Sequence, residues 1–114
     1  MKIHFIISTM MGGGAERVLA LIANKLSEKD NYDISIITLN EGEDEYELSS
    51  SIKRISLDYG RIPNHMLKGL VNLSRFYFKK QNRPDIIISF MTLTNLLTIL
   101  VAKLYSIKII VEEH

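Results

Sequence analysis

The chain lacks cysteine and tryptophan altogether and has only two prolines and six glycines in 114 residues. Without cysteine there is no thiolate nucleophile, no disulfide and no cysteine-ligated zinc site. The apolar share of 46% and the charged share of 24% exclude a disordered chain, and the low glycine content excludes a collagen-like repeat. An excess of one charge is also missing: 14 Lys and Arg face 13 Asp and Glu, so a general nucleic-acid binder gains no support. The length fits a single domain.

Long apolar runs are scarce as well. The run near the N-terminus, Ile3–Ile7, is too short for the apolar centre of a signal peptide, which needs ~7–15 residues. The uncharged stretch from Ile86 to Ala102 is interrupted by serine, threonine and asparagine, and it opens with a β-branched segment, DIIISF. We therefore expect a buried strand followed by a buried helix there, and not a membrane span.

Apolar strand patterns alternate with helical patterns along the chain. The predicted strands are Lys2–Ser8, Asp33–Leu39, Ile52–Leu57, Asp85–Phe90 and Lys108–Val111. The predicted helices are 15–26, Asn64–Lys80 and Thr94–Tyr105, the first with an apolar stripe of Ala15, Val18, Leu19, Ile22, Ala23 and Leu26. The acidic segment 41–47 is expected to be a solvated loop. This alternation predicts an α/β fold with a parallel sheet of about five strands covered by helices on both faces.

In an open parallel sheet, ligands bind beyond the carboxyl ends of the strands, where the strand order reverses. If the first strand is central, the order is 3-2-1-4-5, and the segments 8–14, 89–94 and 112–114 meet at that edge. The turn Gly12-Gly13-Gly14 leads into the first helix, whose N–H groups favour an anion such as phosphate. The turn is not a P-loop. It is not a complete G-x-G-x-x-G motif either, because Arg17 stands at the position of the third glycine. A tight turn that binds no ligand therefore stays open as an alternative. Glu16 lies in the first helical turn, where a carboxylate stabilises the helix dipole. This role explains Glu16 at least as well as contact with a ligand does.

The opening segment, with Gly-Gly-Ala-Glu-Arg-Val from Gly13 to Val18 between a strand and a helix, resembles the N-terminal domain of family-4 retaining glycosyltransferases of GT-B fold. The segment DIIISFMTLTNLLTILVAKLYSIKIIVEEH is similar to the fourth strand, helix and fifth strand of the same domain. The likeness extends over nearly the whole chain, although 41–84 is generic. It implies a three-layer, Rossmann-like α/β/α domain, here residues 1–114, on the acceptor side of a two-domain cleft.

The resemblance also implies a reaction: transfer of a sugar from a nucleotide-sugar donor to a glycan or lipid-linked acceptor with retention of configuration. The glycine turn then approaches the donor diphosphate, and a histidine after the fifth strand, here His114, is the expected catalytic residue. The expected donor- and acceptor-binding residues are Gly12, Gly13, Gly14, Glu16, Phe90, Thr92, Thr94 and Glu113. The nucleotide sugar is a substrate, and neither a metal nor another cofactor is expected. The family's paired glutamates lie in a second, donor-binding domain that this chain lacks, so we expect the chain alone to be inactive.

The charges are unevenly distributed along the chain, although the net charge is close to zero. Six basic residues and no acidic residue fall between Gly60 and Pro84: Arg61, Lys68, Arg75, Lys79, Lys80 and Arg83. Large apolar residues are interleaved with them, which is typical of a helix that lies on an anionic membrane surface. The alternative is a surface helix that packs its apolar side on the sheet. Peripheral attachment through 61–83 suits a cytoplasmic enzyme that acts on a lipid-linked acceptor.

Three other classes are weighed against this hypothesis. A nicotinamide-dinucleotide-binding domain needs the third glycine that Arg17 replaces, and an acidic residue earlier than Glu41. A phospho-acceptor receiver domain needs acidic residues at the end of the first strand, where Ser8 and Thr9 stand. A standalone sugar- or lipid-binding module shares the same strand and helix pattern and stays open.

Overall fold

The computed structural model describes residues 1–8, 14–40, 46–90 and 92–112. The elements follow one another as β1 (Lys2–Ile7), α1 (Gly14–Ser27), β2 (Asp33–Thr38), β3 (Lys53–Ser56), α2 (His65–Phe78), the 3₁₀ helix η1 (Lys80–Asn82), β4 (Ile86–Phe90), α3 (Thr92–Leu104) and β5 (Lys108–Glu112). The expected alternation of strands and helices is confirmed. Two helix boundaries differ from the prediction by two residues, since α2 ends at Phe78 and α3 begins at Thr92, and the other helix boundaries differ by one.

The five strands form one parallel sheet in the order β3-β2-β1-β4-β5, as predicted. β1 lies at the centre, and Phe5 is opposite Ile36 of β2 and Ile88 of β4. Phe5, Ile6 and Ile7 are fully buried because both faces of this strand are covered. The apolar composition along the whole of β1 follows from that position, since no face of the strand meets water.

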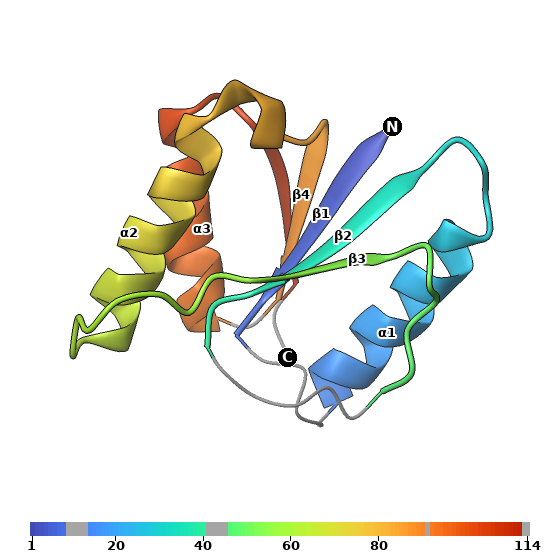
Figure 1. Ribbon diagram of the computed structural model, residues 1–114, viewed down its shortest axis with the longest axis horizontal. Coiled ribbons are helices and arrows are strands. Elements are labelled where there is room, and N and C mark those ends of the chain that lie inside the picture. Colours follow the sequence, from blue (N-terminus) through green and yellow to red (C-terminus); the bar gives the residue numbers. More distant parts are fainter. Residues whose placement is uncertain (9–13, 41–45, 91, 113–114) are drawn as a thin grey trace.

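Helices cover both faces of the sheet, with α1 on one side and α2 and α3 on the other (Figure 1). Alternate residues of each strand therefore enter two separate cores. The core under α1 includes Phe5, Leu19, Ala23, Ile36 and Phe90. The core under α2 and α3 includes Ile6, Ile37, Leu73, Tyr77, Ile87 and Val101.

The buried face of α1 differs from the predicted stripe. Ala15, Leu19 and Ala23 are buried as expected, but Val18 and Ile22 are 38% and 41% exposed. Glu16 and Ala20 are buried in their place. The reason is that segment 46–49 packs along the helix: Asn24 donates from Nδ2 to the Glu47 carbonyl and accepts from the Ser49 N–H. Glu16, Ala20 and Asn24 follow one another at four-residue spacing and so share one face of the helix.

The first turn of α2 begins at an asparagine cap. Oδ1 of Asn64 accepts from the N–H groups of Met66 (3.0 Å) and Leu67 (3.2 Å), and so it satisfies two N–H groups that have no partner within the helix. Pro63 precedes this cap and lies outside the helix.

Replacing the cap tests its contribution. We expect Asn64→Ala to lower the free energy of unfolding by ~1 kcal/mol, because alanine accepts no hydrogen bond. Urea titration followed by far-UV circular dichroism measures the change. Asn64→Asp is the matched control and keeps most of the stability; equal losses in both variants contradict a capping role.

Candidate functional site

The carboxyl edge of the sheet brings together segments that lie far apart in the sequence. β1 ends at Ile7, β2 at Thr38, β4 at Phe90 and β5 at Glu112. Helices α1 and α3 both begin at this edge, the lower end of the sheet in Figure 1. Because β1 is flanked by β2 and β4, the reversal of strand order falls here, as the predicted topology required.

The predicted site residues divide into two groups. The structure places Gly14 at the start of α1, Glu16 in its first turn, Phe90 at the end of β4, and Thr92 and Thr94 in the first turn of α3. All of these lie at the carboxyl edge. The others lie outside the described residues: Gly12, Gly13, Glu113 and His114.

Among the described residues, no heavy atom lies within 4 Å of a Cβ built on Gly14, and the backbone of this residue is helical. Neither packing nor backbone geometry therefore requires glycine at this position, where alanine would favour the helix. The N–H groups of the first turn have no partner within the helix, and they carry the positive end of the helix dipole. The start of α1 is thus open to an anionic group.

Glu16 lies inside the fold, with 8% of its surface exposed. Its carboxylate is in the first turn of α1, where a negative charge is favourable. An exposed capping carboxylate is therefore not what the structure shows. Both roles that the sequence suggests for Glu16, dipole compensation and ligand contact, therefore stay open.

Phe90 is also a core residue, only 1% exposed. Its ring lies 6.4 Å from the ring of Phe5, at an interplanar angle of 34°. The side chain anchors the end of β4 to the central strand. It thereby fixes the strand end from which α3 begins two residues later.

Two buried hydroxyl groups lie near this edge, and of the two only Ser89 belongs to a segment that the sequence predicted there. Thr38 Oγ1 and Ser89 Oγ have no hydrogen-bond partner among the described residues, although the two side chains are 1% and 0% exposed. They lie on β2 and β4, the neighbours of β1. In the sequence, each of them is a polar residue in a mostly apolar strand. Such a residue is found in strands with and without a function, so the sequence alone does not single it out. The ends of β1 and β2 are joined by Asn40, which donates from Nδ2 to Ser8 Oγ at 2.6 Å.

His4 lies away from this edge, in the middle of β1. Its Nδ1 is 2.7 Å from the Tyr77 hydroxyl, and the two rings are stacked with centroids 5.7 Å apart. Burial, with a smaller effect of Lys2, lowers the pKa of His4 to about 4, and burial raises the pKa of Tyr77. His4 is therefore a neutral core histidine at pH 7.

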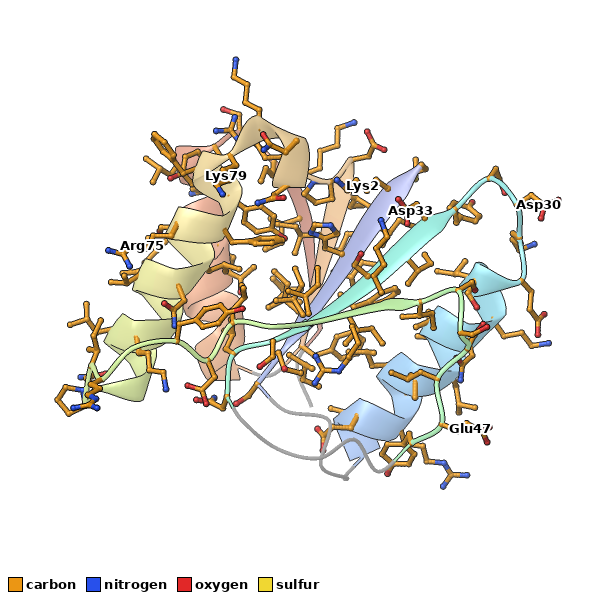
Figure 2. The ribbon with its side chains drawn as sticks, viewed as in Figure 1. Lys2, Asp30, Asp33, Glu47, Arg75 and Lys79 are labelled. Atoms are coloured by element: carbon orange, nitrogen blue, oxygen red, sulfur yellow. The ribbon has the colours of Figure 1, made fainter. Side chains whose placement is uncertain are left out.

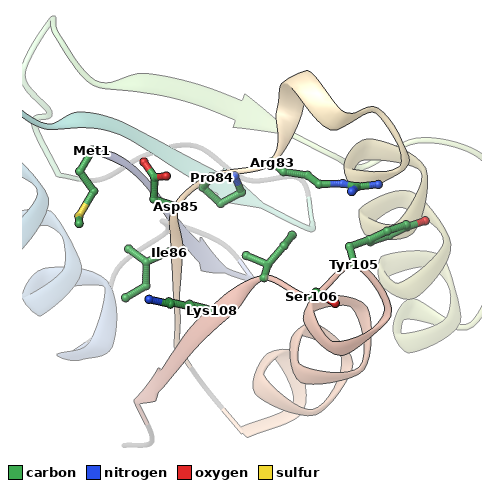
Figure 3. A pocket seen from close by; sticks show the side chains of 9 residues that line it. Met1, Arg83, Pro84, Asp85, Ile86, Tyr105, Ser106 and Lys108 are labelled. Carbon is green, nitrogen blue, oxygen red and sulfur yellow. The ribbon is translucent and has the colours of Figure 1, made fainter.

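A hollow of about 560 Å³ opens at the opposite, amino edge of the sheet (Figure 3). Its polar residues already hold the fold together. The carboxylate of Asp85 accepts from the Lys2 N–H at 2.7 Å, and the Arg83 guanidinium lies 4.6 Å from the centre of the Tyr105 ring. These contacts explain Arg83 and Asp85 without a ligand.

Within the described part of the chain, no group of three His, Asp or Glu side chains is arranged to hold a metal ion. Among the same residues, no helix is long and apolar enough to cross a membrane.

The sequence of the chain was compared with those of known proteins. No family model matches the chain. The chain is 34% identical, over 118 aligned residues and its whole length, to a Campylobacter jejuni enzyme named GalNAc-alpha-(1->4)-GalNAc-alpha-(1->3)-diNAcBac-PP-undecaprenol alpha-1,4-N-acetyl-D-galactosaminyltransferase. The predicted resemblance to a glycosyltransferase is confirmed. The chain spans about a third of that relative, 32% of its length.

The fold is shared with a solved glycosyltransferase. The apo form of the lipopolysaccharide outer core galactosyltransferase WaaB superimposes with a TM-score of 0.66 at 19% identity, over 99% of this chain and 32% of that chain. The predicted Rossmann-like domain of GT-B type, with strand order 3-2-1-4-5, is therefore confirmed.

Proposed function

We propose that the chain is the N-terminal, acceptor-side domain of a family-4 retaining glycosyltransferase of GT-B fold. The observation that carries the proposal is the 34% identity to the Campylobacter jejuni transferase along the whole of this chain. The shared fold of WaaB supports the domain type. A second Rossmann-like domain then supplies the paired glutamates and most of the donor pocket.

The nucleotide-sugar donor is proposed to meet this domain at the carboxyl edge of the sheet. Gly14 and the preceding Gly12 and Gly13 allow the diphosphate to approach the start of α1, whose free N–H groups stabilise an anion. Thr92 and Thr94, which belong to the first turn of α3, are proposed to contact the substrates from the β4 side of the reversal point. Glu113 and His114 follow β5, and we propose His114 as the residue nearest the transferred sugar.

The acceptor is proposed to be a glycan carried on a lipid diphosphate. The name of the Campylobacter jejuni relative describes a glycan linked through a diphosphate to undecaprenol. Such an acceptor is held in a membrane, so the enzyme is proposed to act at the cytoplasmic face, attached peripherally through 61–83.

A transfer assay tests the proposal. We expect the full-length protein to transfer a labelled sugar from a nucleotide-activated donor to an undecaprenyl-diphosphate-linked glycan, because it unites both halves of the cleft. Nucleotide-activated N-acetylgalactosamine and galactose are the first donors to try, since these sugars occur in the names of the two similar proteins.

The 114-residue chain is the matched comparison in the same assay. It should give no transfer above the uncatalysed background, since it spans only about a third of the length of the Campylobacter jejuni transferase. Sugar transfer by this chain alone contradicts the proposed division of labour. Absence of transfer by the full-length protein with every donor, together with binding of the free glycan, favours a sugar-binding module instead.

A further inference from the structure

The chain is anchored at the end of β1, directly before residues 9–13. The ladder between β1 and β2 runs to the pair Ile7 and Thr38. The ladder between β1 and β4 stops earlier, at the pair Ile6 and Ser89. At Ser8, the next residue of the chain, contacts therefore come from the residues that follow β2.

Asn40 forms two hydrogen bonds with Ser8. Its backbone N–H donates to the Ser8 carbonyl at 3.0 Å, and its side-chain Nδ2 donates to Ser8 Oγ at 2.6 Å. The Leu39 N–H donates to the same carbonyl at 3.1 Å. Ser8 and Asn40 are both half-buried, so the bond between their side chains is partly shielded from competing water. Asn40 thus holds both the backbone and the side chain of Ser8.

The position of Ser8 restricts the position of helix α1. Only residues 9–13 separate Ser8 from Gly14, with which α1 begins. A chain advances at most ~3.6 Å per residue, so a link of this length keeps Gly14 close to Ser8. We therefore expect a displacement of Ser8 to alter the position of the first turn of α1. The N–H groups of that turn have no partner within the helix, and the donor diphosphate is proposed to approach them.

We propose that Asn40 is a positioning residue for donor binding. It acts through Ser8, from which residues 9–13 lead to the first turn of α1, and so it keeps this turn in place for the diphosphate. A side-chain amide suits this role because it donates a hydrogen bond and adds no negative charge beside the ligand. The inference rests on the proposed function, since it assigns Asn40 to the proposed donor site.

Amide hydrogen exchange followed by NMR tests the positioning without a substrate. In an α-helix the Val18 N–H donates to the Gly14 carbonyl, so its exchange rate reports how often the first turn opens. The Phe5 N–H in the buried centre of β1 is the reference for global stability. Relative to Phe5, exchange at Val18 should become about fivefold faster in Asn40→Ala, the factor that corresponds to one neutral hydrogen bond.

Ser8→Ala removes the other partner of the side-chain hydrogen bond. It should accelerate exchange at Val18 to the same extent as Asn40→Ala does. The double variant Asn40→Ala/Ser8→Ala should show no further increase, because each single change already breaks the bond. Far-UV circular dichroism checks that each variant is folded.

Steady-state transfer by the full-length protein tests the link to the donor. Asn40→Ala should raise the donor KM about fivefold, the same factor as for exchange, and leave the acceptor KM unchanged. Asn40→Asp separates position from charge. Its carboxylate accepts a hydrogen bond from the Ser8 hydroxyl, so exchange at Val18 should return to the rate of the unchanged protein. Its negative charge repels the diphosphate, so the donor KM should stay raised.

Asn24 provides the matched control. Its side chain also joins distant segments, since it donates to the Glu47 carbonyl and accepts from the Ser49 N–H. Figure 2 shows Glu47 on the segment that runs beside α1. Asn24→Ala removes hydrogen bonds of the same kind near the other end of the helix. It should leave both the relative exchange rate at Val18 and the donor KM unchanged.

Unchanged exchange at Val18 or an unaltered donor KM in Asn40→Ala overturns the inference. Equal effects in Asn24→Ala, or a donor KM that recovers in Asn40→Asp, overturn it as well, because a purely structural role predicts both. A full-length protein that transfers no sugar contradicts the proposed function instead. The exchange rates then still decide whether Asn40 positions the first turn of α1.

Discussion

Acidification from pH 7 to pH 4 should lower the free energy of unfolding by about 3 kcal/mol through His4 alone. The folded pKa of His4 is about 4, against 6.5 for an unperturbed histidine. Each unit of difference corresponds to ~1.4 kcal/mol, so a shift of about 2.5 units gives this value. The effect is large because the imidazole is only 1% exposed in the central strand.

The direction follows from which state binds the proton. Between pH 6.5 and pH 4 the unfolded chain protonates His4, while the folded protein keeps it neutral. The unfolded state thus binds more protons, and stability falls as the pH falls through this window. The contribution of His4 is complete above pH 6.5 and is lost below pH 4. Lys2 and Lys53 strengthen the shift by repulsion, and Asp33 opposes it.

Urea titrations across this pH range measure the effect by far-UV circular dichroism, since the chain has no tryptophan. Tyr77→Phe is the first control: it removes the hydrogen bond but leaves the histidine buried, so the pH dependence should persist at lower stability. The double variant His4→Leu/Tyr77→Phe replaces both polar partners with apolar groups and should abolish this part of the pH dependence. An unchanged slope in the double variant contradicts the role of His4.

The sheet could be predicted from the sequence because its signals are local. β1 and β2 are apolar on both faces, as buried parallel strands are, and each is followed by a turn or loop. The strand order follows from the alternation of strands and helices together with the right-handed crossover rule. The same strand order was sufficient to predict that Gly14, Thr92 and Thr94 lie at the carboxyl edge.

The contacts that could not be predicted join residues far apart in the chain. The His4–Tyr77 hydrogen bond spans 73 residues, and no local pattern indicates it. The apolar residues of α1 fit two neighbouring helical faces, and the contacts of Asn24 with Glu47 and Ser49 select between them. The burial of Glu16 and the exposure of Val18 follow from that selection. Thr38 and Ser89 became visible only when the burial of their hydroxyls was known.

Gly14→Ala should separate ligand binding from folding. A methyl group at this position meets nothing in the fold, and alanine is favoured over glycine in a helix by up to ~1 kcal/mol. The variant should therefore be at least as stable as the unchanged protein. If the donor diphosphate approaches the start of α1, the same methyl group meets the ligand instead. Crowding of this kind costs ~1–3 kcal/mol, which corresponds to a donor KM about 5- to 150-fold higher.

Gly60 provides the matched control. It has a φ of +84°, and a Cβ there also meets no atom within 4 Å. Gly60→Ala should lose stability, because an L side chain is strained at that φ, while the donor KM stays unchanged. Gly14→Ala should thus weaken donor binding without loss of stability, whereas Gly60→Ala should lose stability without a change in donor binding.

Thermal unfolding of each variant and donor titration of the full-length protein measure the two effects. An unaltered donor KM in Gly14→Ala favours the alternative left open by the sequence, a tight turn that binds nothing. A raised KM accompanied by lower stability instead indicates a structural role for Gly14. Only unchanged or higher stability with weaker donor binding assigns the open space at Gly14 to the ligand, because no other contact in the fold occupies it.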